Sequence, residues 1–231
     1  MPRRARAISG GFLYHVLNRG NAKAALFEKP PDYEAFLRIL GEAITKHPIP
    51  LLSYCLMPTH WHFLLWPHTT LGARLSLFLH WITVTHAQRL HAHRHTSGTG
   101  HIYQGRFKSF PVQQGEPLLA VARYIERNPL RAGLVDRAEK WPWSSLHARL
   151  HDPAGKKNLL VEIPDLPSDW MQRVNEPETA GELESLRRAV NRGSPLGESA
   201  WARKTARKCG LESTLRERGR PVAKKSREKI N

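Results

Sequence analysis

Four short apolar stretches in the first half of the chain, some of them alternating with polar residues, are typical of β-strands. We expect these strands at residues 11–18, 49–57, 59–66 and 104–113. The fourth stretch contains Pro111, which lacks the N–H that an inner strand donates. It should therefore lie at an edge of the sheet or end early.

Three longer stretches place apolar residues every three to four positions, which predicts amphipathic helices at residues 32–46, 71–95 and 117–128. The last helix should end at Asn128, because Pro129 disfavours further helical turns. A β-α-β-β-α-β order is the ferredoxin-like motif, an α+β fold in which two helices cover one face of an antiparallel sheet. The other face is left for the third helix.

Two histidines stand one residue apart in the third predicted strand, His60-Trp61-His62. Alternate residues of a strand share a face, so His60 and His62 point the same way, while Trp61 and Phe63 point toward a core. Two neighbouring imidazoles can share one metal ion. A pair of ordinary polar strand residues is the alternative, and the His-x-His spacing alone does not decide between them.

The third predicted helix adds Tyr124 and Asn128, which lie four residues apart and hence on one face. If this helix covers the histidines, the amide oxygen of Asn128 can complete a divalent metal site that still has open positions for phosphate oxygens. Tyr124 can then act as a nucleophile on phosphorus, helped by the positive site. Glu126 falls on another side of the helix, and we do not expect it to act as a base.

Other residues compete for these roles. The remaining tyrosines are Tyr14, Tyr33, Tyr54 and Tyr103, and none of them has an amide partner at helical spacing. His15 on the first strand has either a structural role or a place at the site. Arg106 and Lys108 on the fourth strand either hold phosphates or are solvated charges. Trp141 and Trp143 either stack on unpaired bases or close the core.

The net charge is +16 in 231 residues, with 36 Lys and Arg against 20 Asp and Glu. Such an excess favours a polyanionic partner, and nucleic acid is the first candidate. An anionic membrane is disfavoured, because we find no apolar run near 18 residues. Cys55 and Cys209 are the only cysteines and lie far apart, so we expect no disulfide framework and a cytoplasmic location, close to the nucleoid.

The regular pattern fades after about residue 150. Residues 151–180 read as an irregular linker, and the rest returns to helical composition and becomes basic. Residues 201–231 hold 11 Lys and Arg and 3 Asp and Glu, so they contribute +8 of the +16. A segment around residues 201–215 is expected to form a small helical module. Arg218 and Arg220 stand in an Arg-Gly-Arg-Pro sequence that is similar to minor-groove hooks, although a solvated basic tail is the alternative.

Four segments occur in a characteristic order, and they lie between about Tyr14 and Ser145. They read PTHWHFLLWP, QGRFKS, YIERNPLRAGLV and WPWSS. This combination resembles the HUH-type single-tyrosine transposases, and most of all the branch associated with repetitive extragenic palindromes (REP). Thr59 departs from the family pattern, which commonly has Asn there.

The resemblance implies a metal pair at His60 and His62, a nucleophile at Tyr124 and an amide ligand at Asn128. The implied reaction cleaves and joins single-stranded DNA beside hairpins through a 5′-phosphotyrosine, leaves a free 3′-OH and uses Mg²⁺ or Mn²⁺. We therefore expect a catalytic domain at residues 1–150 and a basic DNA-binding extension at 151–231, as a monomer or a homodimer. A non-catalytic nucleic-acid binder and a hydrolytic nuclease are the rival hypotheses.

Overall fold

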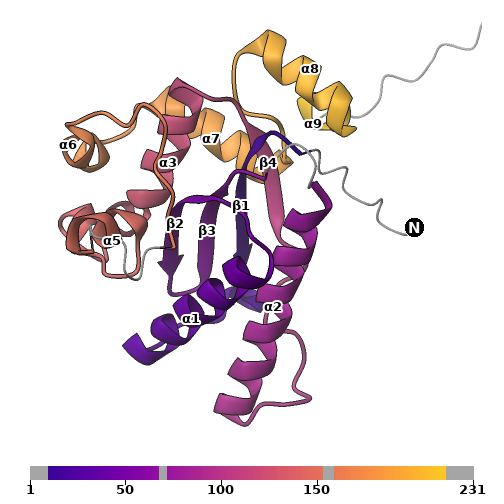
Figure 1. The fold of residues 1–231 in the computed structure, drawn as a ribbon, viewed down its shortest axis with the longest axis vertical. Helices are drawn as coiled ribbons and strands as arrows, with labels where there is room; N and C mark the ends of the chain where they lie inside the picture. Colours follow the sequence, from indigo (N-terminus) through magenta and orange to yellow (C-terminus); the bar gives the residue numbers. More distant parts are fainter. Residues whose placement is uncertain (1–9, 68–71, 153–158, 217–231) are drawn as a thin grey trace, which may run out of the picture.

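The computed structural model describes residues 10–67, 72–152 and 159–216, and its centre is a four-stranded antiparallel sheet with the order β2-β3-β1-β4 (Figure 1). The strands are β1 (Leu13–Arg19), β2 (Leu51–Met57), β3 (His60–Leu65) and β4 (Lys108–Val112). Helix α1 (Pro30–Lys46) joins β1 to β2, and α2 (Gly72–Arg94) joins β3 to β4. The predicted α+β, ferredoxin-like fold is confirmed.

The fourth strand is shorter than predicted, because the residues before Lys108 bend toward the end of β1. The backbone N–H of Gln104 donates to the carbonyl of Arg19 at 3.0 Å, and Arg106 lies in the bend rather than in the strand. β4 is one of the two edge strands, as Pro111 led us to expect. A later segment covers this edge, since the N–H of Leu196 donates to the carbonyl of Pro111 at 2.9 Å.

One face of the sheet packs against α1 and α2, which lie side by side (Figure 1). Trp61, Phe63 and Leu65 of β3 point to this side and are fully buried. Tyr33 of α1 stacks on Trp143 with ring centroids 4.8 Å apart. Trp143 therefore closes the core at the start of α1, which is the plainer of the two roles considered for it.

The opposite face forms a second core under α3 (Glu116–Glu126), which continues after one residue into α4 (Asn128–Arg131). Leu118, Val121 and Ile125 of α3 pack there against Leu64 of β3. The third helix thus covers the face that we expected it to cover. Both faces of the sheet are consequently buried, and polar groups on either face need partners.

Glu126 illustrates how such a polar group is satisfied in the second core. Its fully buried carboxylate accepts hydrogen bonds from Ser145 at 2.5 Å, from Arg149 at 2.5 Å and from the Trp170 indole at 2.8 Å. The carboxylate ties α3 to later segments of the chain. It is a structural group and not a base, in agreement with the helical position of Glu126.

The second half of the chain is more regular than its sequence suggested. Its helices are α5 (Ser145–His151), α6 (Trp170–Asn175), α7 (Ala180–Arg192), α8 (Ser199–Cys209) and α9 (Glu212–Leu215). Helix α6 lies inside the range that we predicted to be irregular, because Trp170 and Val174 are buried in the second core together with Leu186 of α7. In residues 10–67, 72–152 and 159–216, every helix is too short or too polar to cross a bilayer.

Candidate functional site

The two histidines of β3 lie on the face covered by α3, with ring centroids 5.0 Å apart. β3 pairs with β1 on one side and β2 on the other, so His62 lies in the middle of the sheet and is only 3% exposed. His60 stands at the strand end next to the Pro58–Thr59 turn and is half-buried. The predicted pairing of the imidazoles on one face is what the alternation of a strand produces.

Each imidazole uses its Nδ1 atom within the protein. His60 Nδ1 lies 3.1 Å from the hydroxyl of Thr59, and His62 Nδ1 lies 2.8 Å from Nε2 of His15. Histidines that bind metals usually hold one ring nitrogen in such a bond and present the other to the ion. The arrangement therefore leaves Nε2 of both histidines as the donor atoms.

Both histidines are held in the neutral form that binds metals. Burial, together with the positive charges of Arg131 and Arg19, lowers the pKa of His60 from 6.5 to about 4. Burial lowers the pKa of His62 well below its ordinary value, and the neighbouring His60, His15 and Arg131 add to this effect. The two imidazoles are therefore uncharged at neutral pH, which is the form that can bind a metal ion.

His15 of β1 belongs to the same cluster, which sequence reasoning left undecided. It is fully buried, its ring stacks on that of His62 at 5.0 Å, and burial lowers its pKa from 6.5 to about 3. The strand alternation of β1 together with the antiparallel register to β3 places it there. That register is a tertiary feature, so a period-two pattern alone does not reveal the contact.

Tyr124 comes to the cluster from α3. Its ring centroid lies 6.0 Å from that of His62 and 6.1 Å from that of His15, and the residue is 9% exposed. The hydrophobic side of α3 packs on the sheet through Val121 and Ile125, so the helix delivers the phenol over the imidazoles. The structure brings together the tyrosine and the histidine pair that we predicted from separate segments.

Asn128 lies one turn after Tyr124, at the break between α3 and α4. Its amide Nδ2 donates to the carbonyls of Tyr124 at 3.0 Å and of Ile125 at 3.3 Å. Pro129 has no N–H to offer to the carbonyl of Ile125, so the side-chain amide takes that place. These bonds orient Oδ1 away from the helix backbone, where Nη2 of Arg131 donates to it at 2.5 Å.

Arg131 is a site residue that sequence reasoning missed. Its guanidinium carbon lies 4.1 Å from the centroid of the Tyr124 ring, in the geometry of a cation–π contact. It is seven residues after Tyr124, which is two helical turns. That spacing is visible in the sequence, but only the continuous path of α3 and α4 across the break turns it into a contact.

The remaining tyrosines are unsuited to the role of nucleophile. Burial raises the pKa of Tyr33 to about 12 and raises those of Tyr54 and Tyr103 further above the ordinary value. Tyr103 donates into the core of the other face, where its oxygen lies 2.7 Å from Nδ1 of His86. Tyr14 is buried in that same first core.

The predicted phosphate-binding residues fall in different places. Lys108 stands on β4 opposite Leu17, which in turn lies opposite His62, so it shares the sheet face of the site and is exposed. Arg106 is exposed in the bend before β4. Arg218 and Arg220 lie outside the described residues.

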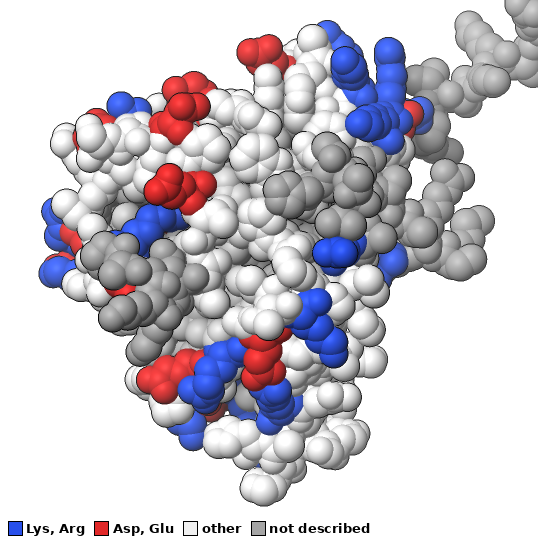
Figure 2. Space-filling model, in the orientation of Figure 1, with Lys and Arg blue, Asp and Glu red and all other residues white. Residues whose placement is uncertain are grey.

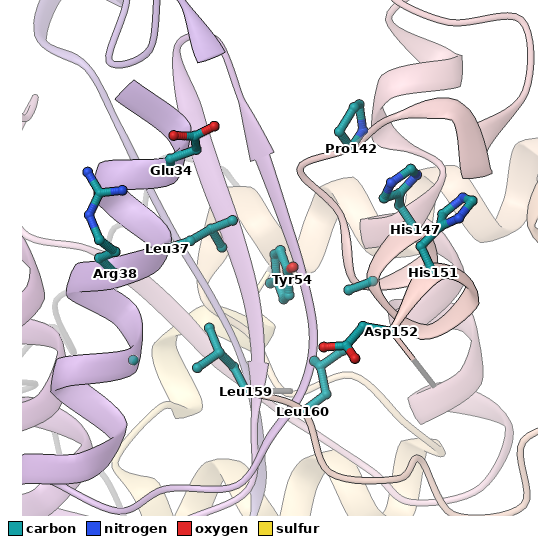
Figure 3. Close-up of a pocket in the computed structure, with 12 residues that line it drawn as sticks. Glu34, Leu37, Arg38, Tyr54, Pro142, His147, His151, Asp152, Leu159 and Leu160 are labelled. Carbon is teal, nitrogen blue, oxygen red and sulfur yellow. The ribbon is translucent and has the colours of Figure 1, made fainter. Parts of the chain in front are cut away.

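A cavity of about 880 Å³ between α1, β2 and α5 is separate from this cluster (Figure 3). Leu37 and Leu159 form part of its wall, Tyr54 lies between them and α5, and His147 and His151 stand on α5 at the other side. None of His60, His62, Tyr124 and Asn128 lines this cavity. This cavity is therefore not part of the candidate site, which lies on the sheet face under α3.

The donor set of the cluster fits a divalent metal ion. Two neutral imidazole nitrogens and one amide oxygen leave positions for phosphate oxygens, and each imidazole has a partner that fixes its ring. Within the part of the chain that the structure describes, no three His, Cys, Asp or Glu side chains gather as a metal site. The amide of Asn128, predicted from the sequence as the third ligand, stays a prediction.

Comparison with known proteins assigns the chain to a family. The family model described as "Transposase IS200 like" matches residues 10–128. No curated protein matches the chain. A solved structure of a REP-associated tyrosine transposase bound to a REP hairpin is similar at 18% identity and a TM-score of 0.49, over 78% of this chain and 99% of that one.

A proposed transposase of Deinococcus radiodurans R1 is similar at 16% identity and a TM-score of 0.37, over 58% of this chain and 92% of that one. Both structural likenesses are too weak to carry an activity or a partner across. The family match includes β1 to α3 and ends at Asn128. It therefore covers all four of the residues His60, His62, Tyr124 and Asn128.

Proposed function

The chain belongs to the family of IS200-like transposases, and from this premise we propose that it cleaves and rejoins single-stranded DNA through Tyr124. The observation that carries the proposal is the position of the Tyr124 ring, 6.0 Å from the ring of His62, whose own ring lies 5.0 Å from that of His60. A phenol beside histidines that can bind a metal ion is an arrangement suited to attack on a phosphodiester.

In the proposed reaction the Tyr124 oxygen attacks the phosphorus of the scissile phosphodiester. A phosphorus–oxygen bond forms to the tyrosine while the bond to the 3′ oxygen breaks. The phenol loses its proton to solvent, and the leaving 3′ oxygen takes one up as a hydroxyl. The 5′-phosphotyrosine keeps the energy of the broken diester, so a 3′-OH can later reverse the attack and rejoin a strand.

We propose that Nε2 of His60, Nε2 of His62 and Oδ1 of Asn128 would hold Mg²⁺ or Mn²⁺. Such an ion, when bound, supplies Lewis-acid stabilisation to the phosphate oxygens. Asn128 meets this role with its amide already oriented by the carbonyls of Tyr124 and Ile125. Preorientation of a ligand lowers the cost of ordering it on binding.

The substrate class rests on the charge and on the resemblance of the four sequence segments. A net charge of +16 favours a polyanion, and the resemblance favours single-stranded DNA marked by hairpins. We propose that residues 1–150 carry the chemistry and that residues 151–231 bind DNA, close to the nucleoid. The resemblance leaves both a monomer and a homodimer open.

We expect Tyr124→Phe to abolish a covalent protein–DNA adduct, because it removes only the attacking oxygen. The measurement incubates the protein with labelled single-stranded oligonucleotides from beside its own gene, then separates adducts on denaturing gels. The affinity for DNA in gel shifts should stay within about 2-fold of that of the wild-type protein, since the phenylalanine ring can pack between α3 and the sheet as the tyrosine ring does. Tyr33→Phe in the first core is the matched control and should keep the adduct. An adduct that persists in Tyr124→Phe would place the nucleophile elsewhere.

His60→Ala should remove the dependence of adduct formation on added Mn²⁺ while leaving DNA binding in place. The rival hypotheses give other results in the same assay. A hydrolytic nuclease would cleave the oligonucleotide without an adduct, and a non-catalytic binder would shift the DNA and leave it intact.

A further inference from the structure

Three arginines stand four residues apart along α3 and α4, at Arg123, Arg127 and Arg131, and all of them bind the segment that runs from the end of α6 to the start of α7. Arg123 donates to the carbonyls of Glu176 at 3.0 Å and Pro177 at 2.9 Å. Arg127 donates to the carbonyl of Asn175 at 2.5 Å. These bonds fix the segment, residues 174–178, against α3, the helix to which Tyr124 belongs.

Glu178 ends the segment, one residue before Thr179, which caps the helix α7, and its side chain is only 4% exposed. One carboxylate oxygen accepts from Nε of Arg127 at 3.0 Å, and the other accepts from Nη1 of Arg131 at 2.8 Å. A buried carboxylate that uses each oxygen for a different guanidinium is held in one position. Glu178 therefore fixes the place of Arg131 as well as that of Arg127.

Arg131 touches the groups of the proposed reaction directly. Its guanidinium carbon lies 4.1 Å from the centre of the Tyr124 ring, and its Nη2 donates to Oδ1 of Asn128. The positive charge also lies close enough to lower the pKa of His60 and His62. A guanidinium fixed here can stabilise negative charge on the phenolate oxygen and on a phosphate that approaches it.

We propose that Glu178 is a positioning residue for the strand-transfer reaction, because it holds the guanidinium of Arg131 against Tyr124. The inference rests on the proposed function of Tyr124. An unpartnered arginine side chain loses rotamer entropy when it is ordered. Glu178 has already ordered Arg131 in the protein without DNA, so the charge is in place when the phosphate arrives.

A plainer role for Glu178 would be to anchor the α6–α7 connection through Arg127 alone. The two roles differ in which arginine transmits the effect. If Glu178 acts on the reaction through Arg131, its substitution should have no further effect once Arg131 has been replaced. If it acts through Arg127, the same should hold in a protein that lacks the Arg127 guanidinium.

The test measures the rate constant of adduct formation at saturating labelled single-stranded oligonucleotide in Glu178→Gln, Arg131→Met and the double variant. We expect Glu178→Gln to lower it roughly 10- to 100-fold, the range typical of groups that orient a catalytic residue, with the half-saturating DNA concentration nearly unchanged. Glu178→Gln should add little to Arg131→Met but keep its full effect in an Arg127→Gln background. Glu184→Gln is the control, because Glu184 is exposed and pairs only with the exposed Arg188 in the described residues.

A second readout needs neither DNA nor metal. In protein labelled with 3-fluorotyrosine, the ¹⁹F resonance that Tyr124→Phe removes belongs to Tyr124. Glu178→Gln should shift this resonance and leave those of Tyr33 and Tyr103 in place, whereas a general disturbance of the fold would move all of them. An unmoved Tyr124 resonance would overturn the role of Glu178. So would a double variant whose loss in rate constant is the product of the losses in Glu178→Gln and in Arg131→Met. Absence of an adduct in the wild-type protein would instead refute the proposed function.

Discussion

His86 of α2 lies in the first core with its Nδ1 2.7 Å from the hydroxyl oxygen of Tyr103. The indole of Trp61 donates to that oxygen at 3.2 Å, so the Tyr103 hydroxyl is left to donate to His86. A neutral imidazole is needed to accept this bond. Burial lowers the pKa of His86 from 6.5 to about 3, which keeps the ring neutral.

This histidine makes the stability of the protein depend on pH. Because the folded pKa is lowered, the stability from His86 is complete above pH 6.5 and is lost as the pH falls toward about 3. Between pH 7 and 5 the loss should be about 2 kcal/mol. We expect His86→Gln to reduce the fall in unfolding free energy over this range by that amount, in urea titrations at both pH values. The exposed His93→Gln is the control and should leave the fall unchanged.

The residue scale also shows how far the sequence could predict the site. The facing of His60 and His62, and the spacing of Tyr124 and Asn128, follow from the periods of a strand and a helix, which are local properties. The contact of His15 with His62 depends on which strands are neighbours. The partner of Arg131, Glu178, comes from 47 residues later in the chain, and no local period relates the two.

At the scale of elements, the break between α3 and α4 is built from one Asn-Pro step. Asn128 donates to the carbonyls of Tyr124 and Ile125, so the helix continues in direction although Pro129 lacks its N–H. The backbone N–H of Arg131 bonds to the carbonyl of Arg127 at 2.9 Å and resumes the helix. As a result, Arg131 contacts both the Tyr124 ring and the Asn128 side chain.

Asn128→Leu should lower the unfolding free energy by about 1–3 kcal/mol, because two buried carbonyls lose their donor without a large change in volume. In a Pro129→Ala background the backbone N–H at position 129 can reach the carbonyl of Ile125, so the same substitution should cost less. Chemical denaturation of the four proteins of this cycle gives the difference. Equal costs in both backgrounds would show that Asn128 does not replace the proline's missing donor.

At the scale of the whole molecule, positive charge gathers over α8 in the view of Figure 2. Ala202, Thr205 and Ala206 form the buried side of this helix, and Arg203, Lys204 and Arg207 are exposed. A groove between α7 and α8 is also lined by Arg188 and Arg192. Because the buried side of α8 is made of small residues, the helix lies close to the body and presents its cations outward.

Arg203→Gln with Arg207→Gln should therefore weaken binding of hairpin DNA and make it less sensitive to salt. Each phosphate contact contributes about 0.9 to the slope of log affinity against log salt concentration, so the slope should fall by up to about 2. Fluorescence anisotropy titrations at about 50 to 200 mM salt measure this slope. Arg38→Gln with Arg74→Gln, on α1 and α2, removes the same charge and is the control. An identical fall in both variants would mean that only net charge matters.

The amino-acid sequence by itself determined the order of the elements, the α+β fold, the two faces of β3 and the spacing within α3, because these depend on periods of two and of 3.6 residues and on prolines. Only the tertiary structure decided that α6 and α7 complete the second core, that His15 stacks on His62 and that Glu178 holds Arg131 against Tyr124. Such contacts join residues that are distant along the chain. They are selected by packing and burial of charge in the folded protein, which no local pattern encodes.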